Sequence, residues 1–271
     1  MYKRYQISIP ENQALFATQY YYDKGVSHLK KTSDSLESQL DRFEQVGVHL
    51  DADFIMKNWF PDTAQHVFIS HSHSDEKQVI MLCGWLSDRF GINSFVDSKL
   101  WGYSNKLLKI IDNKFSKSIV GTTYDYDKRN ISTSHVHVML MSSLIKMIDK
   151  AECLLFVNTE SSVAMNEGVN EEKTLSPWIY SELSVSNVIK INVPARRKEL
   201  IKATNESYRF DSLAGIAQDS AVTALYDIAG ILREIKKIPL ETLAEWHENV
   251  RDTPKANLDW LYDNVYTGGD E

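Results

Sequence analysis

Short apolar runs that alternate with amphipathic stretches constrain the fold of this chain more than any other feature. Three runs have the length and apolar content of buried strands: residues 66–70, 92–96 and 152–158. Four stretches have helical periodicity: residues 74–90, 104–115, 134–150 and 176–187. Strands that alternate with helices predict βαβ units, and therefore an α/β fold with a central parallel sheet flanked by helices.

Small polar residues mark the starts of several predicted helices. Ser74, Ser176 and Thr253 each stand at the start of an amphipathic stretch. Their side chains are expected to accept hydrogen bonds from N–H groups of the first turn. Gly91 is expected to end the helix before it, because glycine readily adopts the left-handed conformation of a helix end.

The predicted sheet occupies the middle of the chain. Residues 63–195 are expected to form the α/β domain. Residues 1–62 read as a helical N-terminal extension, with one helix beginning near Asn12 and others at 33–46 and 51–60. Residues 196–271 read as a mostly helical C-terminal extension, because helical periodicity resumes beyond Pro194.

Composition narrows the possible partners. A net charge of −7 and an isoelectric point near 5.7 argue against nonspecific nucleic-acid binding, which needs excess Lys and Arg. The two cysteines, Cys83 and Cys153, lie in apolar stretches and are expected to be small buried residues. No secretion signal and no apolar run of membrane-spanning length is apparent, so we expect a cytoplasmic protein with no membrane contact.

A ligand of such a sheet is expected at the carboxyl ends of its strands. The loops at 70–75, 97–103 and 158–175 each follow a predicted strand, so they are expected to line one rim. The first loop contains His71, His73 and Asp75 in an HxHxD pattern that zinc hydrolases also use. The only nearby candidates for further zinc ligands, His135 and His137, lie at the start of a predicted helix. The ligand set is therefore incomplete, a strand-to-helix turn is the favoured interpretation, and no metal site is assigned.

Trp178 and Glu182 lie four residues apart on a predicted helix, so they share one face. A carboxylate beside an aromatic wall suits chemistry at a glycosidic bond, where it stabilises positive charge that develops on the sugar. The alternative is structural, with Trp178 in the core and Glu182 on the surface.

Several segments in order carry a family resemblance. They are VFISHS at 67–72 followed by Asp75 and Glu76, GINSFVDS at 91–98 followed by Trp101, LLFVNT at 154–159, and SPWIYSE at 176–182. Over residues 64–195 the chain resembles the Toll/interleukin-1 receptor (TIR) domain family. This resemblance implies a flavodoxin-like fold.

The resemblance also implies an activity. Bacterial TIR enzymes cleave the nicotinamide–ribose bond of NAD+ to give nicotinamide and ADP-ribose or a cyclic ADP-ribose-type signal, often in defence against phage. Glu182 matches their catalytic glutamate. Residues that match or neighbour substrate-contacting positions are Phe68, Ser70, His71, Asp97, Trp101 and Trp178. NAD+ would be the substrate, with no cofactor or metal. The resemblance further implies assembly into a homo-oligomer and a separate effector that responds to the product.

Other functions remain open at the level of sequence. The leading one is a non-catalytic TIR-like interaction module, in which the loop around Asp97 and Trp101 docks onto other copies. A relative of nucleoside deoxyribosyltransferases would share the architecture and a carboxylate that faces ribose. A flavodoxin-like electron carrier is disfavoured, because the loop after the first predicted strand has no phosphate-binding pattern. Residues 104–150 are longer and more helical than the middle of a usual TIR domain.

Overall fold

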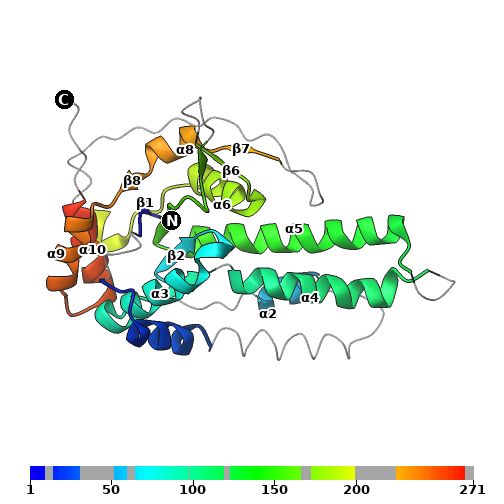
Figure 1. Cartoon of the computed structure of the whole chain (residues 1–271), viewed down its shortest axis with the longest axis horizontal. Helices are drawn as coiled ribbons and strands as arrows, with labels where there is room; N and C mark the ends of the chain where they lie inside the picture. Colours follow the sequence, from blue (N-terminus) through cyan, green and yellow to red (C-terminus); the bar gives the residue numbers. More distant parts are fainter. Residues whose placement is uncertain are drawn as a thin grey trace. The chain divides into compact units, whose positions relative to one another are not determined.

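The computed structural model describes most of the chain as two compact units (Figure 1). The described residues are 1–9, 15–30, 52–59, 65–96, 98–118, 123–165, 172–198 and 224–265. The first unit comprises Met1–Val26, Ala64–Phe95 and Ile148–Glu271, and the second comprises Ser27–Thr63 and Val96–Met147. The predicted helix at 33–46 and the predicted helix start near Asn12 lie outside the described residues.

A five-stranded parallel sheet forms the centre of the first unit. Its strand order is β3 (Ser94–Val96), β2 (Val67–Ser70), β4 (Cys153–Val157), β1 (Lys3–Ile7) and β8 (Lys236–Lys237). All residues of β2, β3 and β4 are buried, as expected for strands covered by helices on both faces. The predicted α/β class with a central parallel sheet is confirmed, and the architecture is consistent with a flavodoxin-like fold.

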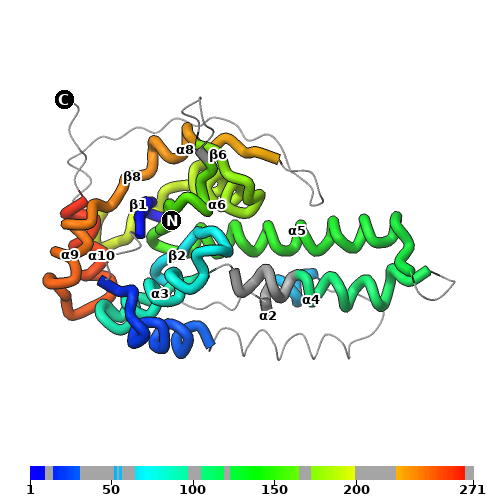
Figure 2. The backbone as a smooth tube through the Cα atoms, viewed as in Figure 1, coloured from blue at the N-terminus to red at the C-terminus, as the bar shows by residue number. Residues whose placement is uncertain are grey.

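Two strands of this sheet come from the segments expected to be helical extensions. Figure 2 shows the tube of β1, near the N-terminus, beside that of β8, close to the other end of the chain, and the two strands pair in one sheet. Lys3 pairs with Cys153 and Tyr5 pairs with Lys236, so β1 lies between β4 and β8. β1 could not be recognised in the sequence because only two of its residues, Tyr5 and Ile7, are buried. Between them, the side-chain amide of Gln6 donates hydrogen bonds to backbone carbonyls.

The helices of the first unit agree in most details with the sequence. Gly91, with a φ of 65°, ends α3 (Glu76–Phe90). The Ser176 hydroxyl accepts a hydrogen bond from Ile179 N at 3.3 Å at the start of α6 (Pro177–Val188). Thr253 caps α10 (Pro254–Asn264) in the same way. The first unit also contains α8 (Ala229–Glu234) and α9 (Leu240–Glu248).

The predicted cap at Ser74 is wrong. Ser74 lies inside a short 3-10 turn, η1 (His73–Asp75), and α3 begins only at Glu76. The turn forms because Asp75 N donates to the carbonyl of Ser72 at 2.9 Å. This extra turn brings the Asp75 side chain into the protein, where it is 7 % exposed.

Two glycines allow the helix at residues 19–30 to cross α3 closely. A Cβ atom on Gly84 would lie 1.9 Å from Tyr21 O, and one on Gly25 would lie 1.9 Å from Ile80 O. Such distances are far below van der Waals contact, so any larger residue at either position pushes the two backbones apart.

We expect Gly84→Ala to lower the free energy of unfolding by about 1–3 kcal/mol, the usual cost of overpacking. Urea denaturation followed by circular dichroism measures it. Gly230→Ala in α8 is the matched control, because a Cβ atom added at Gly230 would have no neighbouring atom within 4 Å. The control is expected to stabilise by up to about 1 kcal/mol through helix propensity. Equal behaviour of the two variants would contradict the close crossing.

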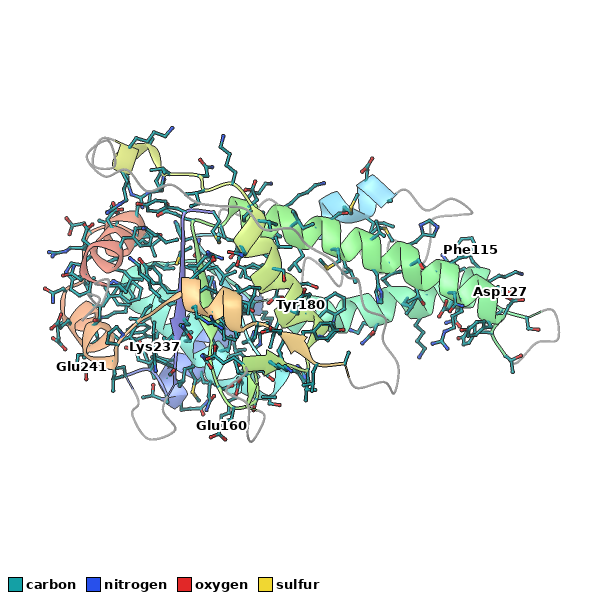
Figure 3. All side chains as sticks on the ribbon, turned by 90° about the horizontal axis from the view of Figure 1, so that it is seen from above. Phe115, Asp127, Glu160, Tyr180, Lys237 and Glu241 are labelled. Atoms are coloured by element: carbon teal, nitrogen blue, oxygen red, sulfur yellow. The ribbon has the colours of Figure 1, made fainter. Side chains whose placement is uncertain are left out.

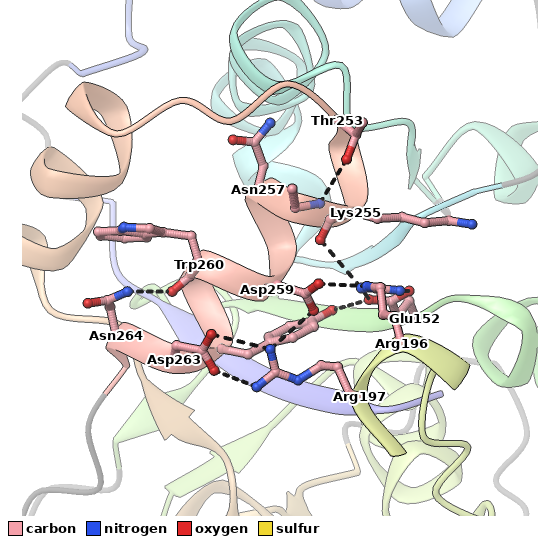
Figure 4. Close-up of polar contacts among 12 residues, drawn as sticks. Glu152, Arg196, Arg197, Thr253, Lys255, Asn257, Asp259, Trp260, Asp263 and Asn264 are labelled. Atoms are coloured by element: carbon pink, nitrogen blue, oxygen red, sulfur yellow. Dashed lines mark hydrogen bonds and ion pairs between the residues drawn. The ribbon is translucent and has the colours of Figure 1, made fainter. Parts of the chain in front are cut away.

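A cluster of ion pairs connects α10 with the segment that follows α6 (Figure 4). Arg196 pairs with Glu152 and, at 2.7 Å, with Asp259. Arg197 pairs with Asp259 at 3.2 Å and also with Asp263. Because Glu152 directly precedes β4, this cluster joins the C-terminal helix to the sheet.

The second unit contains α2 (Ala52–Trp59), α4 (Ser98–Phe115) and α5, which begins at Tyr126 and ends at Lys150. α4 and α5 form a hairpin, and Figure 3 labels Phe115 and Asp127 near its tip. Arg129 donates to Asp112 at 3.1 Å across this hairpin. The expected loop at 97–103 is wrong in part, because α4 already begins at Ser98.

Three short strands that come after β4 and before α8 along the chain form a small antiparallel sheet. Its order is β5 (Ala164–Met165), β6 (Glu172–Thr174) and β7 (Tyr226–Asp227). It replaces part of the loop expected at 158–175. Within the described ranges, no helix is both long enough and apolar enough to cross a membrane.

Candidate functional site

The topology of the sheet places a switch point between β2 and β4. After β2 the chain passes through α3 to β3 on one side, whereas after β4 it proceeds to β8 on the other side. The connections that leave these two adjacent strands therefore diverge at their carboxyl ends. In open parallel sheets, ligands bind at such a position.

Ser70 and His71 lie at the carboxyl end of β2 and are both buried. Ser70 is level with Phe156 of β4 and is 0 % exposed, and His71 is 4 % exposed. The Ser70 hydroxyl has no hydrogen-bond partner among the described residues. A buried hydroxyl without a protein partner is unusual, because leaving it unsatisfied costs free energy. Ser70 is therefore a candidate to bind a ligand.

A hydrogen bond joins the segments that follow the two strands. The Thr159 hydroxyl, two residues beyond β4, donates to a carboxylate oxygen of Asp75 at 2.6 Å. The same hydroxyl accepts from Ser162 N at 3.3 Å, which turns the chain after β4. This contact links the segments that follow β2 and β4.

We expect Thr159→Val to lower the free energy of unfolding by about 1.5–3 kcal/mol, because the lost hydrogen bond is to a charged group. Equilibrium unfolding in urea checks the value. Ser161→Ala removes a hydroxyl from an exposed position of the same turn and is expected to change stability by less than about 0.5 kcal/mol. If both variants unfold alike, the Thr159–Asp75 contact does not hold the two segments together.

Glu182 is fully buried, at 0 % exposure, in the middle of α6. This helix lies against β2, the strand that ends in Ser70. Fully buried glutamates are rare, because taking a carboxylate out of water is costly unless it serves a specific interaction. The structural alternative, a surface Glu182 beside a core Trp178, is wrong, because Glu182 is the buried residue and Trp178 is only half-buried.

The neighbours of Glu182 along α6 divide between two faces. Trp178 lies one helical turn before Glu182, on the same side of the helix. Tyr180 lies on another side, where its ring stacks on Tyr226 of β7 at 4.9 Å between centroids. Tyr180 therefore fixes α6 to the small sheet, and Figure 3 labels it there.

Of the remaining predicted site residues, the structure describes only the side chain of Phe68, which lies in the core. Phe68 is 0 % exposed inside β2, and its ring lies 5.4 Å from that of Phe95, so it is a core residue in this structure. Asp97 lies outside the described residues. Trp101 belongs to α4, but its side chain is not among the described ones.

The histidine pattern does not converge on a common point. His71 is buried, whereas His73 in η1 is exposed. His135 and His137 lie well inside α5, which begins earlier than the sequence predicts. In the part of the chain that the structure describes, no group of three or more His, Cys, Asp or Glu side chains is arranged to hold a metal ion.

The contact between Asp75 and Thr159 could not be predicted from the sequence. Each residue follows a strand directly or within a few positions, and the two strands prove to be neighbours in the sheet. The contact could be predicted only if β2 and β4 were known to be neighbours, and the order of strands within a sheet does not follow from their order along the chain.

Comparisons with known proteins identify no relative. No protein-family model matches the chain, and no significant match was found among curated proteins or solved structures.

Proposed function

We propose that this protein is an NAD+ nucleosidase of the TIR type, which cleaves the nicotinamide–ribose bond with Glu182 as its catalytic residue. The observation that carries the proposal is the complete burial of Glu182 on α6, against the strand that ends in Ser70. Buried carboxylates are rare, and active sites are where carboxylates are often buried, so a fully buried glutamate on a helix that packs on β2 is a candidate catalytic group.

The proposed chemistry uses the carboxylate as an electrostatic stabiliser. Nicotinamide in NAD+ is a cationic leaving group, so its departure leaves an electron pair on its ring nitrogen and positive charge on the ribose. Glu182 would oppose that charge and hold ribose hydroxyls, and a low-dielectric site strengthens both effects. Attack of water on the ribose gives ADP-ribose, and attack by an atom of the substrate itself gives a cyclic product.

Two further groups support a ribose or phosphate at this position. The Ser70 hydroxyl is available to donate to a ligand oxygen, and Trp178 offers an aromatic ring one turn before Glu182. The Thr159–Asp75 contact would keep the two loops in place while substrate binds. Asp97 and Trp101 keep the substrate-contacting role that the family resemblance implies.

The proposal extends to the setting in which the enzyme acts. A cytoplasmic homo-oligomer that responds to phage infection and signals to a separate effector is the arrangement that fits the resemblance. The net negative charge and the absence of basic blocks disfavour a nucleic-acid ligand. They are compatible with a dinucleotide substrate that binds in one local site.

The test is incubation of the purified chain with NAD+ and quantification of nicotinamide by chromatography, with products identified by mass spectrometry. Release of nicotinamide is expected. Cleavage of deoxynucleosides without cleavage of NAD+ would assign the chain to deoxyribosyltransferase-like chemistry instead. Failure to cleave either substrate at high protein concentration would favour the interaction module.

A further inference from the structure

Two histidines from distant parts of the chain hold the end of α3 and the residues that lead into β3. His247, near the end of α9, accepts a hydrogen bond at Nδ1 from the indole N–H of Trp85 at 3.0 Å. His66, just before β2, accepts one at Nδ1 from Asn93 N, also at 3.0 Å. A ring nitrogen accepts a hydrogen bond only while it carries no proton. Both contacts therefore require a neutral imidazole whose proton is on Nε2.

The residue that donates to His247 lies in the core. Trp85 is 0 % exposed, and its ring contacts those of Phe16, Phe90 and Trp246. The ring planes of Trp85 and His247 differ by 10° and their centroids lie 6.1 Å apart, which fits a hydrogen bond in the plane of both rings. A proton on Nδ1 would set two N–H groups against each other. The indole N–H would then lack an acceptor, which costs free energy for a buried donor.

The charges around His247 do not compensate for this loss. Arg89 of α3 donates from Nε and Nη2 to the carbonyl of His247 at 3.0 and 2.8 Å. A guanidinium therefore already occupies the C-terminal end of α9, where a cation would otherwise be favourable. Asp88, the acid next to Arg89, is paired with Lys24 at 2.7 Å. Burial and then Arg89 lower the pKa of His247, and Glu248 offsets only part of this effect.

The second histidine shows the same behaviour. Burial is the largest cause that lowers the pKa of His66, Glu152 opposes it, and Lys255 and Arg196 add to it. Protonation of His66 would remove the acceptor of Asn93 N, as it does for Trp85. Because Asn93 is exposed, water can replace the ring as acceptor, and we expect the effect of His66 to be the smaller one.

We propose that His247 and His66 form a pH-sensitive switch, which weakens the contact of α9 with α3 and the contact between the residues before β2 and β3 when the two rings take up protons. Above about pH 6.5 both rings are neutral in the folded and in the unfolded chain. As the pH falls below this value, the unfolded chain takes up its protons before the folded chain does. Stability is therefore lost until the pH passes the lower pKa values of the folded chain. The switch does not depend on the proposed NAD+ chemistry.

Urea denaturation of the full chain over a range of about pH 5–8 tests the switch. As the pH falls below about 6.5, each histidine is expected to raise the equilibrium constant of unfolding by up to about tenfold per pH unit. His247→Asn keeps an acceptor close to the place of Nδ1 but cannot take up a proton, so it is expected to reduce this slope. His66→Asn is expected to reduce it by less.

His135→Asn is the matched control, because His135 is exposed to solvent on α5. It is expected to keep the parental slope. The comparison uses the slope with pH, so a change in stability that is uniform across the range does not affect it. An unchanged slope in the His247→Asn protein would overturn the proposal, and an unchanged slope in the His66→Asn protein would overturn the part that concerns His66.

Hydrogen exchange measured by mass spectrometry locates the effect in the chain. At about pH 5.5, amides of α9 and of the end of α3 are expected to exchange faster in the parent than in the His247→Asn protein, and at about pH 8 the two proteins are expected to exchange alike. Each comparison is made at one pH, so the intrinsic effect of pH on exchange cancels. Equal exchange at the lower pH would overturn the weakening of the contact between α9 and α3. Because neither experiment uses NAD+, its failure is separate from a failure of the proposed activity.

Discussion

Glu182→Gln is expected to lower the rate of NAD+ cleavage at least about a hundredfold while the protein folds normally. Glutamine keeps the size of the side chain but removes the charge that would stabilise the ribose cation, and the loss of one such electrostatic contact typically costs a factor of about 100–1,000. Because glutamine and glutamate have nearly the same size, the packing around this fully buried position is expected to be kept.

The measurement is nicotinamide release per mole of enzyme, with circular dichroism and thermal unfolding on the same samples. Glu160→Gln is the matched control, because Glu160 is an exposed glutamate on the turn after β4 and close to the candidate site in sequence. It is expected to cleave NAD+ at nearly the parental rate. Parental activity in a folded Glu182→Gln protein would remove the catalytic assignment altogether.

Trp246→Ala is expected to lower the free energy of unfolding by about 3–5 kcal/mol, the cost of deleting a large aromatic side chain from a packed core. Trp246 in α9 is 1 % exposed. Its ring stacks on Phe90 at 4.3 Å and meets Trp85 edge-on at 5.5 Å. Its indole N–H donates to the carbonyl of Asn257 at 3.0 Å, so the variant also leaves a buried acceptor without its donor.

Chemical denaturation followed by circular dichroism gives the value. Trp260→Ala in α10 is the comparison, since Trp260 is only half-buried and its loss is expected to cost clearly less. The same experiment decides whether α9 belongs to the core. A Trp246→Ala protein as stable as the parent would mean that α9 contributes little to the packing of α3.

Much of the sheet could be predicted from the sequence. β2, β3 and β4 are continuous apolar runs, the pattern of strands that are buried on both faces. Ser176 and Thr253 begin helices as caps, and Gly91 ends one with a positive φ. These patterns depend only on residues that are close in sequence, so the sequence is enough to predict them. Glu182 was predicted as the catalytic residue from its spacing to Trp178 and from a family resemblance. Its burial could not be predicted from that spacing.

The rest depended on contacts between distant residues. β1 contains Lys3, Arg4 and Gln6, so its polar content hides a strand whose partners lie far along the chain. β8 has only two residues, Lys236 and Lys237, which no pattern of hydrophobicity can identify. The contact between Thr159 and Asp75 likewise follows only once β2 and β4 are known to be adjacent.

The position of β1 has a consequence for how the protein is made. Its residues leave the ribosome long before their partners, yet Lys3 must pair with Cys153, and Tyr5 with Lys236. At roughly 5–20 residues per second, translation leaves this segment without either neighbour for on the order of 10 s. An unpaired strand in that interval is a template for wrong partners. Its lysine, arginine and glutamine side chains would keep the segment solvated until its partners are made. The polar residues that prevent its recognition as a strand would therefore also protect the nascent chain from aggregation.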